Sequence, residues 1–267
     1  TTANTESELA SVVAHEISHV TQRHLARRLE SQNKAQPLTM AAMVSSVLLT
    51  LINPSVGLAA LSTTMAASQQ AGINYTRGNE QEADRVGIML LANSGFNPQG
   101  APDFFAIMAE KYRYKSKPPA MLLTHPLPES RIADARIRAQ NFSPRPLAPN
   151  LQFELAKARI MARYEGNAKD NIINFQQSLD KKRYGIEAAA QYGLALSHYE
   201  NKDFQTAITQ LEALLRDDNK NLFYVDALTD AYIAVKAFDK AITMLAELNL
   251  LMPNNQVLTL NYANVLN

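Results

Sequence analysis

The sequence predicts a mainly α-helical protein in two parts, a compact helical domain followed by a stack of paired helices. Three observations indicate this fold class. Glycine and proline are scarce, at 9 and 12 of 267 residues, whereas the strong helix formers alanine, leucine, glutamate and glutamine are plentiful. Residues that can bind a metal lie one helical turn apart at two places in the first third of the chain. A period of 34 residues recurs in the last third.

Composition narrows the function classes. With 26 basic and 25 acidic residues the net charge is +1, which argues against a nucleic-acid partner. It also gives no electrostatic reason to expect an anionic membrane surface. The absence of cysteine excludes disulfides and thiolate metal sites, and it is compatible with an oxidising compartment without indicating one.

The string His15-Glu16-Ile17-Ser18-His19 predicts a metal-binding helix. On a helix, His15 and His19 project from one face one turn apart, where two neutral imidazoles can hold one Zn²⁺. Glu16 lies beside them and can take a proton from the water of such a metal. The pattern is typical of a zinc helix.

This helix should begin at about Thr5, because Thr5 and Glu8 form a capping box, and we expect it to run to about Glu30. Basic residues in its second half suit the negative end of the helix dipole: Arg23, Arg27 and Arg28. An apolar stripe at helical spacing should face the core, with the histidines along its edge: Leu9, Val13, Ile17 and Val20.

Catalytic zinc usually has three protein ligands, so a third is needed. Leu25 occupies the position six residues after His19, and His24 points to another face, where we expect it to pack or to support a ligand. Glu80 and Asp84 are again one turn apart. Glu80 could bind the metal, while Asp84 could accept the second N–H of a ligand histidine and fix its tautomer. The alternative is an acidic first turn favoured by the helix dipole.

Residues 35–76 carry no charge. Two apolar runs, Met40–Ile52 and Val56–Ala67, are each shorter than the roughly 20 residues of a transmembrane helix, and Asn53-Pro54 should end the first helix near Ile52. We therefore expect a helical hairpin. It could pack in the core, form a mobile apolar lid over the metal cleft, or touch an unfolded client. A shallow membrane contact through residues 40–67 is the remaining alternative.

Beyond it, we expect the second ligand helix over residues 79–93, a helix starting at Asn97-Pro98, and a loop between Lys111 and Pro119. In residues 124–128, two prolines should hold an extended backbone around His125. His125 could reach the metal and stabilise an oxyanion, or occupy the open coordination position and keep the site idle. It could also be a surface histidine. Arg131 is a weaker oxyanion candidate and a better ion-pair partner.

The proline-rich residues 143–149 indicate a linker. After it, Phe204, Ala207, Ile208, Leu211 and Leu214 recur 34 positions later as Phe238, Ala241, Ile242, Leu245 and Leu248. This is the period of tetratricopeptide repeats, whose stacked helix pairs form a groove for a peptide. An earlier, degenerate copy should run through Tyr164, Ile173 and Leu179. Aromatic residues of this region are expected between helices: Tyr192, Tyr199, Phe223, Tyr224 and Tyr232.

These motifs resemble the gluzincin metallopeptidases of the HtpX and Oma type. The resemblance rests on the two ligand motifs and on the strings HEISHVTQRH, NEQEADRVG and THPLPESRIADAR. It implies that His15, His19 and Glu80 are the zinc ligands and that Glu16 is the general base. Asp84 and His125 complete the candidate catalytic set. The implied organisation is a zinc metallopeptidase domain in residues 1–142, a linker in 143–150 and a tetratricopeptide-repeat domain in 151–267.

The resemblance also implies a setting, the bacterial periplasm. There the enzyme would act in quality control and assembly of outer-membrane β-barrel proteins, on unfolded or misassembled substrates, while the repeats contact the assembly machinery. Such proteases carry a signal peptide and a segment with a substrate-binding edge strand before the zinc helix. Here that helix begins almost at residue 1, so we expect a fragment.

The competing hypothesis is a repeat adaptor or chaperone whose zinc site is structural or shut by His125. Glu16 argues against it, because a purely structural site needs no carboxylate there.

Overall fold

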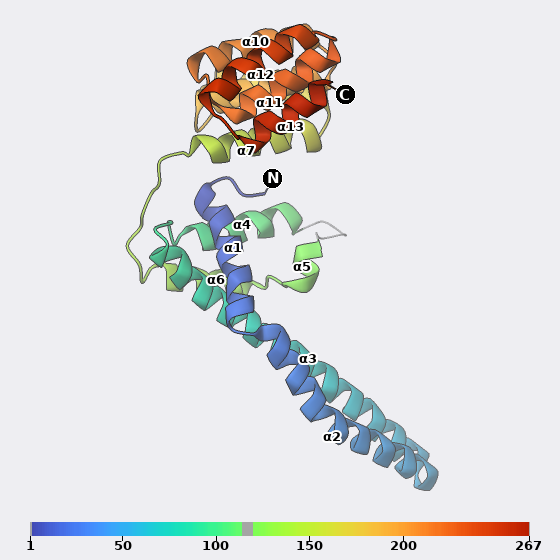
Figure 1. The fold of residues 1–267 in the computed structure, drawn as a ribbon. Coiled ribbons are helices and arrows are strands. Elements are labelled where there is room, and N and C mark those ends of the chain that lie inside the picture. Colours follow the sequence, from blue (N-terminus) through green and yellow to red (C-terminus); the bar gives the residue numbers. More distant parts are fainter. Residues whose placement is uncertain (1, 114–119, 267) are drawn as a thin grey trace. The chain divides into compact units, whose positions relative to one another are not determined.

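The computed structural model describes residues 2–113 and 120–266 (Figure 1). These residues form helices and loops without a β-strand among them, so the predicted mainly α class is confirmed. The chain divides into two compact units, one from Thr2 to Leu147 and one from Ala148 onward.

The N-terminal unit is built around a long helix that meets three shorter ones. Helices α1 and α6 both pack on α3, and α4 packs on α1 and α6. Its small apolar core contains Ala14, Ile88, Leu91, Ala101 and Ala135. The bounds of its helices are α1 (Glu6–Thr21), α2 (His24–Ile52), α3 (Pro54–Asn93), α4 (Gly100–Tyr112), α5 (Ala120–Thr124) and α6 (Glu129–Ala139).

Helix α1 begins where the capping box predicts, because Thr5 Oγ1 accepts the Glu8 N–H at 3.2 Å. Its predicted end is wrong. Arg23 adopts a left-handed backbone with φ 55°, which stops α1 at Thr21 and lets α2 start at His24. The basic residues therefore lie at the start of α2, near the positive end of its dipole, so their expected role at a negative helix end is also wrong.

The predicted core stripe of α1 is wrong too. Its four residues are exposed, whereas α1 buries small and polar side chains: Ser7, Glu8, Ser11, Ala14, His15 and Ser18. The cause is the closeness of α3 and α4. A Cβ on Gly87 would lie 3.2 Å from the His15 backbone, and one on Gly100 would lie 2.6 Å from the Ser7 backbone. At these two points of close contact the backbones leave no room for a large apolar side chain.

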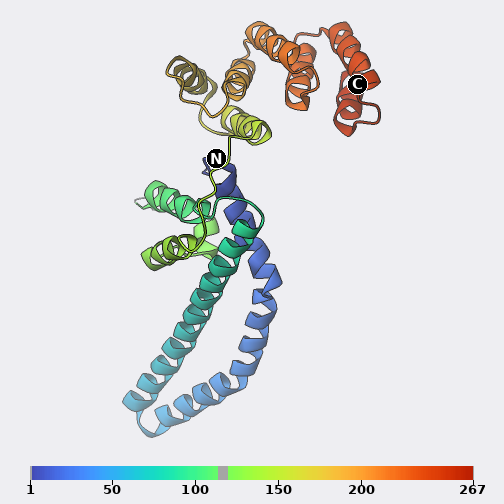
Figure 2. The same cartoon turned by 90° about the vertical axis from the view of Figure 1, so that its left-hand side faces the viewer.

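The predicted hairpin is confirmed. Helix α2 ends at Ile52, Pro54 opens α3, and the Asn53 side chain accepts the Val56 N–H at 3.4 Å. The two helices leave the rest of the unit as a long antiparallel pair (Figure 2). Most of the large apolar side chains on this pair are exposed, so packing in the core is excluded for them.

Two predicted helix starts shift. The helix expected from residue 79 is the last part of the continuous 40-residue α3, because nothing in residues 54–78 breaks the helix. Helix α4 begins at Gly100 rather than at Asn97-Pro98, and Asn97 Oδ1 instead accepts the Gln99 N–H at 3.2 Å. The loop expected between Lys111 and Pro119 lies mostly outside the described residues.

The second unit consists of antiparallel helix pairs. Ala207 and Leu211 on one helix, and Ala241 and Leu245 at the matching positions 34 residues later, are all fully buried. They belong to a continuous core that also contains the buried tyrosines Tyr192, Tyr224 and Tyr232. The helices are α7 (Leu151–Tyr164), α8 (Ala168–Asp180), α9 (Glu187–Glu200), α10 (Phe204–Asp217), α11 (Leu222–Ala234), α12 (Phe238–Leu251) and α13 (Gln256–Leu266).

The first pair, α7 and α8, does not follow the expected register. Tyr164 and Ile173 are exposed, so the predicted register of the degenerate copy is wrong at these two positions, whereas Leu179 packs on the core. Instead, Asn171 and Phe175 are the buried residues of α8, and they precede Ala207 and Leu211 by 36 positions (207 − 171 and 211 − 175). Two additional residues before α10 shift the period and hide this copy from a search at 34.

Candidate metal centre

Four side chains from three segments meet in the N-terminal unit. His15 and His19 come from α1, Glu80 from α3, and His125 from the loop between α5 and α6. Each offers one ligand atom, and these atoms lie within 4.8 Å of one another. Spacing and the family resemblance predicted the first three as ligands, and a role for His125 near the metal was one of the alternatives left open; the structure brings all four together.

The spacing of the ligand atoms fits a small divalent ion. His15 Nε2 lies 3.0 Å from His19 Nε2, and the Glu80 oxygens lie 3.4 Å from His19 Nε2 and 3.5 Å from His15 Nε2. Ligand atoms at the corners of a tetrahedron around zinc are about 3.3 Å apart when the bonds are about 2.0–2.1 Å. Imidazole nitrogens with a carboxylate oxygen are also a donor set that suits zinc. The residues present therefore fit a zinc ion.

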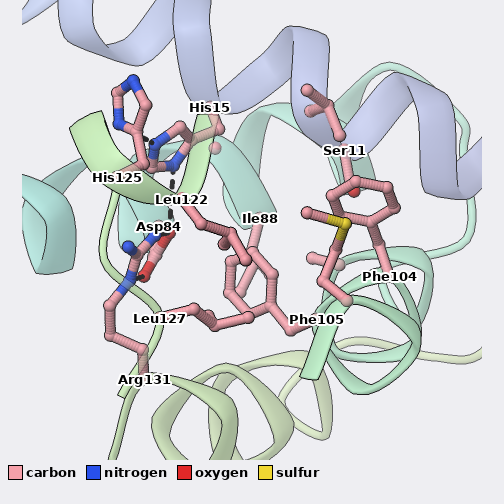
Figure 3. Close-up of a pocket in the computed structure, with 14 residues that line it drawn as sticks. Ser11, His15, Asp84, Ile88, Phe104, Phe105, Leu122, His125, Leu127 and Arg131 are labelled. Atoms are coloured by element: carbon pink, nitrogen blue, oxygen red, sulfur yellow. Dashed lines mark hydrogen bonds and ion pairs between the residues drawn. The ribbon is translucent and has the colours of Figure 1, made fainter. Parts of the chain in front are cut away.

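His125 is part of the cluster and not a remote surface histidine. Its Nδ1 lies 3.0 and 3.1 Å from the two Glu80 oxygens and 3.5 Å from His15 Nε2. Its Nε2 lies 3.7 Å from Glu16 Oε1. The ring therefore separates the ligand residues from Glu16. Figure 3 shows His125 beside His15, above Asp84 and Arg131.

Glu16 stays outside the ligand group. Its side chain is 52% exposed, whereas that of Glu80 is 5% exposed. A carboxylate at the rim, next to the ligands but not bound among them, can accept a proton from a water molecule and release it again.

Arg131 holds the two carboxylates of α3 in place. Its Nε and Nη2 donate to the two oxygens of Asp84 at 2.7 and 2.8 Å. Its Nη1 donates to Glu80 Oε2 at 2.8 Å and to the Pro126 carbonyl at 2.6 Å. The guanidinium is buried and four of its five N–H groups are taken by these acceptors, as the ion-pair interpretation of Arg131 predicts.

Each α1 histidine has a partner behind it. His15 Nδ1 lies 2.9 Å from Asp84 Oδ1, although the angle at this nitrogen is poor for a hydrogen bond. This is the position expected for Asp84. Such a carboxylate behind a histidine fixes the ring and keeps the other nitrogen free for a metal.

His24 supports His19, which is one of the two roles expected for it, and it does so together with Glu82, which the sequence did not connect to it. His24 Nδ1 lies 2.8 Å from His19 Nδ1, and His24 Nε2 lies 3.1 Å from Glu82 Oε2. If His24 donates its Nε2–H to the carboxylate, its Nδ1 accepts the Nδ1–H of His19, and the His19 Nε2 lone pair faces the cluster. Spacing gave no signal for this contact, because it depends on the left-handed turn at Arg23.

Burial and charge set the protonation of the metal-free cluster. Burial disfavours a charge on His15, but the interactions with Asp84 and Glu80 outweigh it and raise the pKa of His15 to about 9. Burial and the neighbouring charge of His15 lower the pKa of His19 to about 4. The pKa of Glu80 falls well below its usual range, because hydrogen bonds from the histidines and the charge of Arg131 overcome burial. A metal would therefore displace a proton chiefly from His15.

A pocket adjoins the cluster on the side of α4 (Figure 3). His15, Asp84, His125 and Arg131 form its polar end. The rest of its lining is mostly apolar: Val12, Ile88, Phe104, Phe105, Met108, Leu122 and Leu127. Of the four ligand residues, His15 and His125 face this pocket.

Comparisons with known proteins agree on one family. The sequence profile of peptidase family M48 matches residues 1–139. The chain is 51% identical over 265 residues to the putative β-barrel assembly-enhancing protease of Vibrio cholerae, which covers 99% of the chain and 55% of that protein. It is 44% identical over 259 residues to the β-barrel assembly-enhancing protease of Yersinia pestis, covering 97% and 53%. It is 43% identical over 262 residues to that of Escherichia coli, covering 98% and 54%. The chain thus spans about half the length of the curated relatives it matches.

Proposed function

Because the chain belongs to peptidase family M48, we propose that its N-terminal unit is a zinc-dependent endopeptidase domain. The observation that carries this proposal is the convergence of three histidines and Glu80 within 4.8 Å, two of the histidines lying on α1, the helix that also presents Glu16. His15, His19 and Glu80 are the proposed protein ligands. A zinc ion bound there supplies a Lewis acid and an activated water, which is the chemistry of zinc peptidases.

The other residues of the site have separate roles in the proposed mechanism. Glu16 takes a proton from the attacking water on its exposed carboxylate and later delivers it to the leaving amine. Asp84 and the His24–Glu82 pair hold the two α1 histidines in the tautomer that leaves their Nε2 lone pairs available. Arg131 keeps Glu80 ionised and in place.

We assign His125 the role of closing the resting site. Its Nδ1 is as near to the Glu80 oxygens as the α1 histidines are, and its ring stands between the ligands and Glu16. In this position it takes the place that a substrate carbonyl needs. Cleavage then requires His125 to leave, and the loop at residues 124–128 is the segment that would carry it away. Once displaced, it could still stabilise an oxyanion from nearby.

We further propose that the substrates are unfolded or misassembled proteins of the bacterial envelope, in the periplasm. The support is that three relatives are named β-barrel assembly-enhancing proteases. On this proposal the second unit, with its stacked helix pairs, binds outer-membrane β-barrel substrates or their assembly machinery.

A second candidate function is a chaperone or adaptor with a structural metal site. One observation favours it, namely that four ligand residues are already together, as in structural zinc sites, which are usually closed by four protein ligands. The position of Glu16, exposed at the rim beside His125, favours the peptidase instead.

The substitution Glu16→Gln distinguishes the peptidase function from the chaperone or adaptor function. If the chain is a peptidase, cleavage of an unfolded protein such as reduced casein should fall by a factor on the order of 10²–10⁴, while zinc content stays at the parental value. Glu30→Gln, an exposed glutamate on α2, is the matched control and should leave cleavage unchanged. Equal cleavage by parent and Glu16→Gln would refute the mechanism.

His125→Ala tests the closed resting site. We expect zinc to be retained and casein cleavage to increase, because the fourth position becomes open to substrate. His198→Ala is the control, since its side chain is 19% exposed against 21% for His125 and it lies in the second unit. Zinc in both proteins with cleavage in neither would favour the chaperone or adaptor function.

A further inference from the structure

The α2–α3 hairpin has the residue distribution of a membrane-embedded helix pair. Among the described residues, α2 is the one helix that is long and apolar enough to cross a membrane by length and composition. Its partner along the outer half is α3 (Figures 1 and 2). The large side chains point outward into solvent: Leu38, Met40, Val44, Val47, Leu48, Leu51, Ile52, Val56 and Leu58 are all exposed.

The contact between the two helices is made by small residues. Ser46 and Gly57 are the buried positions along this part of the pair. A Cβ added to Gly57 would lie 2.3 Å from the backbone nitrogen of Thr50, so the helices touch at this point. Soluble helix pairs bury their large apolar residues and expose polar ones. Small residues inside with large apolar residues outside is the arrangement that membrane helix pairs use.

The apolar faces are longer than one leaflet but shorter than the core of a whole bilayer. From Leu38 to Ile52 an α-helix rises about 22 Å, and from Val56 to Ala67 about 18 Å. The hydrocarbon core is about 30 Å thick, so one leaflet contributes about 15 Å. Above Ala67 the second arm becomes polar, with Ser68, Gln69, Gln70 and Asn74. The polar part of α3 thus prevents the pair from spanning the full core.

Basic side chains flank the uncharged segment at the end of the hairpin away from its tip. Residues 35–76 are uncharged, while residues 23–34 hold four basic side chains (Arg23, Arg27, Arg28 and Lys34) against one acidic, Glu30. Arg77, on α3, is a fifth basic side chain at the same end of the hairpin. Lys34 lies one helical turn, about 6 Å, before Leu38. Arg27 is paired with Glu82 at 2.8 Å and Lys34 with Glu30 at 2.7 Å, so the basic excess at this end is smaller than the number of its basic side chains, but it remains complementary to anionic phosphates.

The backbone of the tip suits an apolar medium. Unsatisfied N–H groups are costly in hydrocarbon. The Asn53 N–H donates to the Leu49 carbonyl at 2.8 Å, Pro54 has no N–H, and the Asn53 side chain accepts the Val56 N–H. The turn therefore carries few donors that need water.

We propose that the α2–α3 hairpin inserts its tip into one leaflet of a phospholipid bilayer with anionic headgroups. Lys34 then lies closest to the phosphates, and the other basic residues of this end lie farther from the membrane along α2 and α3. His24, where α2 begins, is in direct contact with His19 of the metal centre, so the same helix would hold the centre just above the membrane surface. This role is independent of whether the centre cleaves peptides.

The test uses the complete chain and vesicles of phosphatidylcholine with 30% phosphatidylglycerol. Because the chain has no cysteine, Ile52→Cys gives a unique site for the environment-sensitive dye NBD. We expect a blue shift on vesicle addition at position 52, a smaller one at Gln70→Cys, and none at Leu250→Cys, whose side chain is as exposed as that of Ile52 (83% against 84%). Spin labels on the lipid chains should quench position 52 at the depth of one leaflet.

Charge at the tip should abolish binding. Ile52→Asp should lower flotation with vesicles on the order of a hundredfold, whereas Leu250→Asp should not change it. Lys34→Gln and Arg77→Gln should each weaken binding about fivefold, and only when phosphatidylglycerol is present. These side chains are exposed or lie outside the core, so circular dichroism should stay at the parental values.

Two results would overturn the proposal. The first is a dye at position 52 that stays in water while the parent floats, because the contact would then lie elsewhere. The second is an Ile52→Asp variant that keeps vesicle binding and loses binding to unfolded casein, which would assign the hairpin to protein clients instead.

Discussion

The helix pairs of the second unit and the α2–α3 hairpin contain similar apolar residues, but they differ in which residues they bury. The second unit buries large apolar side chains, whereas the hairpin buries small residues and exposes the large ones. In α10 and α12 the leucines Leu211 and Leu245 are fully buried, whereas on the hairpin Leu51 is 80% exposed and the buried positions are Ser46 and Gly57. Apolar content alone therefore does not reveal what a helix packs against. The size of the residues at the helix contact does.

The metal-binding part of the N-terminal unit differs from both regions. Its core contains few large apolar residues, and its best-buried contacts are ionic, around Arg131, Glu80 and Asp84. Stability there should depend on charge pairing, whereas stability in the second unit should depend on packed leucine and tyrosine. The predictions below test this division.

The largest effect is expected from Arg131→Met in the metal-free chain. The substitution leaves two buried carboxylates without their partner, which should destabilise the N-terminal unit by about 3–5 kcal/mol. Hydrogen exchange at increasing urea, followed by mass spectrometry, should report the loss in peptides from the N-terminal unit, Thr2–Leu147, and not in peptides beyond it. Arg138→Met removes an ion pair with Asp134 that is one-third exposed, and should cost less than about 1 kcal/mol. An equal loss in both units would show that they do not unfold separately.

A similar but smaller effect is expected from Leu245→Ala in the second unit. Removing a fully buried leucine leaves a cavity and should cost about 3 kcal/mol, measured as a shift in the urea midpoint for peptides beyond residue 148. Leu250→Ala, on the same helix but 83% exposed, should change stability by less than about 0.5 kcal/mol. Similar losses from both variants would contradict the assigned core.

Local spacing predicted much of the candidate site. His15, His19, Glu80 and Asp84 fall on helices whose one-turn spacing brings each pair to one face, so the sequence was sufficient for them. His125 was only placed near the metal, because its approach depends on how the loop after α5 packs. The helix-hairpin turn was predicted equally well, since Asn-Pro acts locally.

What the sequence did not reveal depends on close packing and on one backbone angle. The apolar stripe of α1 was expected inward, but at the close contacts with Gly87 and Gly100 the backbones leave no room for a large apolar side chain. The support of His19 by His24 and Glu82 requires φ 55° at Arg23, a conformation that no residue preference at this position indicates. The sequence of the uncharged hairpin did not indicate what surrounds it, because the periodicity of apolar residues does not distinguish contact with lipid from contact with a protein core.

The next effect concerns the metal rather than the fold. His24→Ala removes the group that orients His19 and should weaken zinc binding by about 10–100-fold, measured by competition with a chromophoric chelator. Glu82→Gln should produce a smaller loss, because its amide can still accept from His24. His198→Ala is the control. Unchanged affinity in His24→Ala would mean that His19 is held by the helix alone.

The smallest effect is expected at the tip of the hairpin. Leu51 is 80% exposed in the chain without lipid, so Leu51→Ala should change the free energy of unfolding by less than about 0.5 kcal/mol, although it removes as many atoms as Leu245→Ala. The same substitution removes apolar area from the membrane contact and should weaken vesicle binding about tenfold if its buried area is worth about 1.5 kcal/mol. A loss of stability above 1 kcal/mol in water would show that Leu51 packs against protein. The contrast between the hairpin and the core of the second unit would then fail, because both would be stabilised by buried leucine.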